Sequence, residues 1–61
     1  MATYVLTVFE KNGKLLLDES FEAKDDTEAK ELGMQRLYEE GYTEHTYRCV
    51  APNARLVLFQ S

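Results

Sequence analysis

The chain of 61 residues has a single cysteine and no apolar run of the length that crosses a membrane. One cysteine cannot form an intrachain disulfide, and small extracellular proteins are usually rich in disulfides. The N-terminus also lacks the basic stretch and long apolar run of a secretory signal. We therefore expect a cytoplasmic protein that has no membrane partner and forms one compact domain over residues 1–61.

Basic residues are too few and too scattered to form a nucleic-acid site. Eleven acidic residues against seven basic ones give a net charge of −4. Lys11 and Lys14 flank a turn, and the other basic residues are dispersed among acids. Nucleic-acid binding at physiological salt depends on clusters of basic side chains. We do not expect nucleic acid as a partner.

The sequence contains no arrangement of side chains that predicts a catalytic, metal or cofactor site. His45 and Cys49 are the one pair that suggests a nucleophile beside a base. On a single strand they would lie about 13 Å apart, whereas a catalytic hydrogen bond spans about 3 Å. Gly13 belongs to an Asn-Gly turn signal, not to a phosphate-binding loop that leads into a helix. We expect a protein without enzymatic activity and without a cofactor.

The first third of the chain predicts a β-hairpin. Residues 3–9 are almost all β-branched, aromatic or aliphatic, which is typical of a strand. Asn12-Gly13 is a strong hairpin signal, and the second strand should cover residues 14–22. A two-residue loop pairs Val8 with Leu17, Leu6 with Glu19, and Tyr4 with Phe21. Glu19 is the misfit on this apolar face, so we expect it at a sheet edge or a bulge.

A helix is predicted from Asp25 or Asp26 to about Glu40. Asp25 and Glu28 have the spacing of a capping box, and Gly41 suits a left-handed C-terminal cap. The buried spine should consist of Ala29, Gly33 and Leu37, with Met34 and Tyr38 beside it. Leu32 lies on the other side of this spine, which leaves the buried arc open.

Two further strands are predicted over residues 42–51 and 55–60, joined by a tight turn at Pro52-Asn53. That turn pairs Cys49 with Leu56 and Tyr47 with Leu58 on one face, and Arg48 with Val57 and Thr46 with Phe59 on the other. No linker or obvious repeat interrupts the chain. The fold class is α+β: a single β-β-α-β-β domain, with a four-stranded mixed sheet and one helix on one face.

Polarity favours the spatial order 2-1-4-3, counting strands along the chain, because the first and fourth are apolar on both faces. The alternative order is 1-2-3-4. One helix covers only one face of the sheet, which we assign to Tyr4, Leu6, Val8, Leu17, Phe21, Tyr47, Cys49, Leu56 and Leu58. The opposite face then carries Val5, Phe9, Leu16, Val57 and Phe59. These five are either tolerated exposed apolar groups or an interface, and we favour an interface.

The resulting functional hypothesis is a small cytoplasmic protein-interaction module. It would self-associate, as a homodimer, or dock on another protein through the uncovered sheet face. The alternative is an acidic regulatory or inhibitory protein that binds a basic partner. A third hypothesis is a single-stranded RNA binder that stacks bases on Phe9 and Phe59. No motif in the sequence indicates a more specific role.

Overall fold

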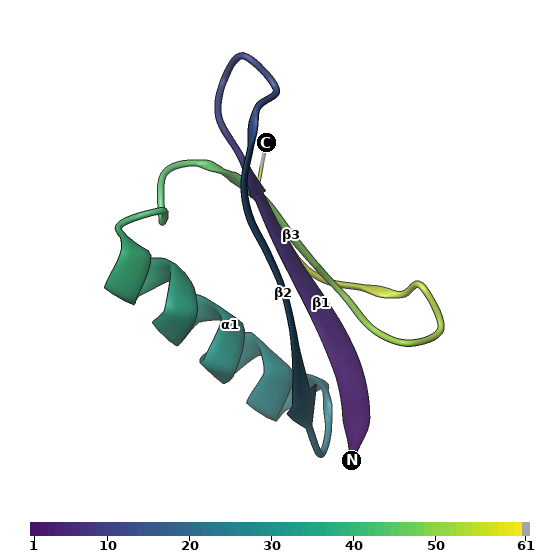
Figure 1. Ribbon diagram of the computed structural model, residues 1–61. Coiled ribbons are helices and arrows are strands. Elements are labelled where there is room, and N and C mark those ends of the chain that lie inside the picture. Colours follow the sequence, from purple (N-terminus) through teal and green to yellow (C-terminus); the bar gives the residue numbers. More distant parts are fainter. Residues whose placement is uncertain (61) are drawn as a thin grey trace.

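The computed structural model describes residues 1–60. Its elements are β1 (Ala2–Phe9), β2 (Leu15–Ala23), α1 (Asp26–Glu40), β3 (Thr46–Val50) and β4 (Leu56–Gln60). Figure 1 shows α1 lying along one face of a twisted sheet, while no element of the described chain covers the other face. The α+β class, the β-β-α-β-β order and the single helix on one face are confirmed.

The strand order differs from the prediction. The four strands lie in the order β2-β1-β3-β4, and every neighbouring pair is antiparallel. The predicted mixed sheet with order 2-1-4-3 was therefore wrong, as was the order 1-2-3-4. With β3 beside β1, the connection through α1 passes over one strand, β1, and not over the two strands of the predicted order. Neighbouring strands lie about 4.8 Å apart, so this connection spans a shorter distance. β4 was predicted to be a central strand because it is apolar on both faces. One of these faces lies on the uncovered side of the sheet, so the apolar side chains there did not indicate a central strand.

The loop of the first hairpin is one residue longer than predicted. The Gly13 N–H donates to the Glu10 carbonyl at 2.8 Å, and the Glu10 N–H donates to the Lys14 carbonyl at 2.8 Å. The loop is thus Lys11–Gly13, and Gly13 has a positive φ of 88°. The Asn12 side chain accepts the Lys14 N–H at 2.9 Å. This is a three-residue hairpin loop with its third residue in the left-handed region.

The second hairpin has the same turn. The Ala54 N–H donates to the Ala51 carbonyl at 2.9 Å, and the Ala51 N–H donates to the Arg55 carbonyl at 2.8 Å. Ala54 takes the place of the glycine, with a φ of 66°. The Asn53 side chain accepts the Arg55 N–H at 3.1 Å. Residues 12–17 and 53–58 share a pattern of asparagine, small residue, base, leucine, aliphatic residue and leucine, a repeat that sequence reasoning missed.

A bulge follows each turn and places one extra residue in the later strand. In β2 the extra residue is Leu16, because Phe9 lies opposite Leu15 and Val8 opposite Leu17. This bulge restores the register after the longer loop. The pairs Val8–Leu17, Leu6–Glu19 and Tyr4–Phe21 are therefore confirmed. Glu19 lies on β2, an edge strand, as expected.

In β4 the extra residue is Val57. Val50 lies opposite Leu56 and Cys49 opposite Leu58, so the predicted pairs Cys49–Leu56 and Tyr47–Leu58 were wrong by two residues. The predicted pairs on the other face were wrong for the same reason, because Arg48 lies opposite Phe59.

The bulges also exchange apolar side chains between the two faces, because an extra residue turns two successive side chains toward one side. Val57 is 9% exposed and belongs to the core, and Leu16 packs against that core. Their neighbours Leu15 and Leu56 are instead 48% and 50% exposed. The prediction that placed Leu16 and Val57 on the uncovered face, and Leu56 on the covered one, was wrong.

The predicted ends of α1 are confirmed. The Asp25 carboxylate accepts the Glu28 N–H at 2.8 Å, and the Glu28 carboxylate accepts the Lys24 N–H at 2.9 Å. At the other end Gly41 has a φ of 76°, and the Tyr42 N–H donates to the Leu37 carbonyl at 2.8 Å. A further turn closed by the His45 N–H and the Tyr42 carbonyl delays the third strand, which therefore begins at Thr46.

The core lies between α1 and the sheet. The buried residues of α1 are Ala29, Gly33 and Leu37, as predicted. A Cβ atom at Gly33 would lie 3.0 Å from the Leu58 Cδ1 atom, which shows how closely the helix approaches β4. Leu32 is 38% exposed and Tyr38 is 79% exposed, so the buried arc excludes Tyr38. The largest fully buried side chains of the core are those of Leu6, Val8, Leu37 and Cys49.

Candidate interaction surface

The open face is the side of the sheet that α1 leaves uncovered. Its apolar side chains are Val5, Phe9, Leu15, Val50, Leu56 and Phe59. Phe59 is the most exposed of them at 57%, and Phe9 and Val50 are half-buried. Such a group of apolar side chains on central and edge strands marks a candidate interaction surface.

Of the five residues predicted as an interface, Val5, Phe9 and Phe59 lie on the open face. Their role as an interface stays a prediction. Leu16 and Val57 lie against the core instead, and sequence reasoning missed Leu15, Val50 and Leu56. The signal that was missed is the sequence of asparagine, small residue and base before both leucine-rich stretches. In both hairpins this pattern accompanies a three-residue loop, which is followed by a bulge.

Strand pairing arranges the open face in rows. Val5 and Val50 lie opposite each other, between Ser20 on β2 and Leu56 on β4. The next row contains Asp18, Thr7, Arg48 and Phe59 in that order. The row beyond contains Leu15, Phe9 and Thr46. Two apolar rows thus flank a row that carries one acid, one base and one large aromatic ring.

The two charges of the middle row form no ion pair with each other in the described part of the chain. Thr7 separates Asp18 from Arg48, and two strand spacings of about 4.8 Å place their backbones roughly 10 Å apart. The Thr7 hydroxyl donates to the Arg48 carbonyl at 3.4 Å. Both charged side chains are exposed, so they are free to meet charges on a partner.

His45 and Cys49 do not form a site together. Cys49 is fully buried, and burial raises the pKa of its thiol. His45 lies in the turn before β3, not on a strand as predicted, with its ring 5.1 Å from the Tyr42 ring. Its Nδ1 atom is buried and has no hydrogen-bond partner among residues 1–60.

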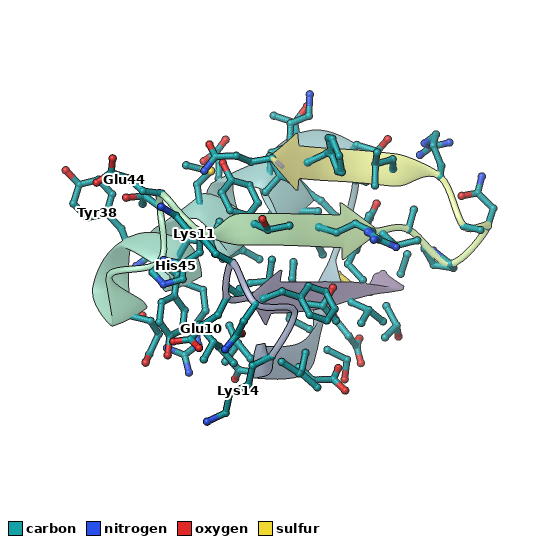
Figure 2. All side chains as sticks on the ribbon, turned by 90° about the horizontal axis from the view of Figure 1, so that it is seen from above. Glu10, Lys11, Lys14, Tyr38, Glu44 and His45 are labelled. Carbon is teal, nitrogen blue, oxygen red and sulfur yellow. The ribbon has the colours of Figure 1, made fainter. Side chains whose placement is uncertain are left out.

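The side chain of His45 lines an open hollow with residues of the first hairpin turn (Figure 2). Glu10 and Lys11 contribute charges of opposite sign to this hollow, and Glu44 adds a second acid. Within residues 1–60 no three His, Cys, Asp or Glu side chains are grouped as metal ligands. The hollow therefore combines mixed charges without a set of ligands that converge on one point.

A family model described as YhzD-like protein matches residues 1–61. The chain belongs to the YhzD-like family. A relative from Bacillus subtilis (strain 168), the uncharacterized protein YhzD, is 42% identical over 59 residues, which cover 97% of each chain. No solved structure matches the chain.

For this member of the YhzD-like family, the described residues include no helix that is long and apolar enough to cross a membrane. The open face is an apolar surface that no element of the described chain covers.

Proposed function

We propose that this YhzD-like protein is a non-enzymatic protein-interaction module whose open face binds a second copy of the chain. The exposure of its apolar side chains supports the proposal: Val5, Leu15, Leu56 and Phe59 are each more than a third exposed. Sheets with one bare apolar face commonly pack on a second sheet about 10 Å away. The partner's open face supplies such a sheet.

The charges of the middle row support a second copy over an unrelated partner. A two-fold axis parallel to β1, between two facing sheets, places β2 of one copy over β3 of the other. Asp18 then faces the partner's Arg48, and the same contact forms twice because the interface is symmetric. Thr7 faces its own copy on the axis. The open face is therefore complementary to itself in charge as well as in apolar character.

The other two hypotheses have less support on this face. An RNA reader needs cations beside its stacking rings, and Arg48 is balanced here by Asp18 in the same row. The hypothesis of an acidic protein that binds a basic partner depends on acidic residues along β2 and α1, and these surround a different surface. A reduced, buried Cys49 suits a cytoplasmic location, which is part of the proposal.

The test is the mass of the protein in solution by multi-angle light scattering over a range of concentrations. The wild type should be a dimer, and Val5→Glu should be a folded monomer, because Val5 lies on β1 at the axis and each copy would bury an unpaired charge there. Tyr38→Glu is the control: it introduces the same charge at an exposed residue of α1 and should remain a dimer.

A charge exchange tests the arrangement of the two sheets. Asp18→Arg and Arg48→Asp should each weaken the dimer, since each places like charges opposite one another. The double variant should restore it. A wild type that stays monomeric at all concentrations would overturn the proposed function, and a failure of the double variant would overturn the two-fold arrangement.

A further inference from the structure

The outer edge of β2 is a second surface, next to the open face. β2 is at one end of the strand order, so within residues 1–60 only β1 pairs with it. It covers Leu15–Ala23, which makes it the longest strand of the sheet at 9 residues. An unpaired edge of this length presents backbone N–H and C=O groups that an added strand can bind.

A groove runs beside this edge, between β2 and α1. Its volume is about 230 Å³, and its apolar lining comes from Leu6, Phe21 and Leu32. Leu32 immediately precedes the buried Gly33 on α1, but it is itself 38% exposed. Side chains of an added strand that point to the α1 side would enter this groove, because successive side chains alternate between the two faces.

The charge around the edge is negative. Three acids and no base lie within Leu15–Ala23: Asp18, Glu19 and Glu22. Arg36 lines the groove, but its guanidinium is engaged by Glu19 at 2.7 Å and by Glu40 at 2.6 Å. Glu39, also in the lining, lies 3.8 Å from the same guanidinium. Arg36 is therefore a single cation among Glu19, Glu39 and Glu40, and the rim of the groove is acidic.

We propose that the β2 edge and this groove bind an extended basic segment of another protein, which adds a fifth strand to the sheet. The residues of that segment alternate. Basic side chains on the open-face side meet Asp18 and Glu22, and apolar side chains on the α1 side pack against Leu32. A second copy of this chain does not fit here, because two β2 edges would bring the same acids together. Asp18 belongs to both surfaces, whereas Glu22 and the apolar lining of the groove belong to this site alone.

The probe is a fluorescein-labelled, capped heptapeptide that alternates lysine and leucine, with lysine at both ends. Its binding, measured by fluorescence anisotropy, should weaken as salt is added. A peptide with glutamate in place of lysine should not bind. Leu32→Gln should weaken binding of the lysine peptide at least tenfold, because it removes the apolar contact in the groove. Leu56→Gln makes the same change at an exposed leucine of the open face and should leave the affinity unchanged.

Methylation of backbone amides tests whether the peptide adds as a strand. In an added strand the N–H groups of alternate residues point toward β2, so methylating either all the leucines or all the lysines should abolish binding. The other series should bind as the parent peptide does. Equal effects of the two series, no detectable binding of the lysine peptide, or a loss with Leu56→Gln instead of Leu32→Gln would each overturn the proposal.

Discussion

Ala54 has a backbone conformation that favours glycine, with a φ of 66° at the end of the second hairpin turn. Gly13 occupies the equivalent position of the first turn at a φ of 88°. The left-handed region costs a residue with a Cβ atom about 1–2 kcal/mol. The substitution Ala54→Gly should therefore remove this cost, and Gly13→Ala, the reverse substitution at the equivalent position, should introduce it.

The net gain is smaller than the strain because glycine also gains freedom in the unfolded chain. That freedom costs about 0.5–1 kcal/mol when the protein folds. Ala54→Gly should raise the free energy of unfolding by about 0.5–1 kcal/mol, and Gly13→Ala should lower it by a similar amount. A Cβ atom at Gly13 meets nothing within 4 Å, so no clash adds to the second figure. The double variant should be close to wild type, since the two turns follow antiparallel strands and lie at opposite ends of the sheet (Figure 1).

The assay is urea unfolding followed by circular dichroism, with thermal unfolding as a second measure. For a domain of this size, 1 kcal/mol corresponds to a shift in Tm of about 4–8 °C. Urea midpoints should move in opposite directions for the two single variants, at unchanged slope. A destabilised Ala54→Gly would refute the left-handed turn. The order of faces in β4, which depends on that turn and its bulge, would then need revision.

Three other predictions concern the core, the helix N-terminus and the thiol. Leu37→Ala should cost about 2–5 kcal/mol in urea unfolding, whereas Tyr38→Ala should change stability by less than about 0.5 kcal/mol; equal losses would contradict the assigned buried arc of α1. The Tyr4 hydroxyl, at 2.8 Å, holds the pKa of Asp26 below its usual value, so this stabilisation is present at neutral pH and lost on acidification. Asp26→Asn should therefore be less stable than wild type at pH 7, with a difference that narrows below about pH 4; a gap that stays constant with pH would argue against this role. Cys49 should react slowly with iodoacetamide at pH 7 until the chain unfolds, because burial raises the pKa of its thiol; rapid labelling of the native protein would instead indicate an activated thiolate.

Local signals predicted the elements well. Asp25 and Gly41 mark the two ends of α1 through short-range hydrogen bonds and a positive φ, and such features depend on neighbouring residues alone. The strand at Thr46 was predicted to begin four residues too early. The turn that displaces it depends on a hydrogen bond between His45 and Tyr42, in a stretch whose side-chain pattern also suits a strand.

The candidate surface was predicted in part. Val5, Phe9 and Phe59 were assigned to the open face by alternation, which holds wherever a strand is regular. Leu16 and Val57 come shortly after the two hairpin loops. The prediction assumed two-residue loops and unbroken alternation there, whereas each loop has three residues, so both residues were assigned to the wrong face. The sequence carries the relevant signal twice, but Ala54 conceals the second copy because alanine rarely occupies the left-handed region.

The sequence by itself determined the helix, the two hairpins and the presence of one sheet face that no helix covers, because these follow from residues near one another in the chain and from the supply of a single helix. The tertiary structure alone decided that β3 lies beside β1, that Leu56 and not Val57 is exposed, and that Asp18 and Arg48 share a row. Strand order depends on the packing of whole hairpins across α1. The face of each side chain near a turn depends on a bulge that closes only when both strands are paired.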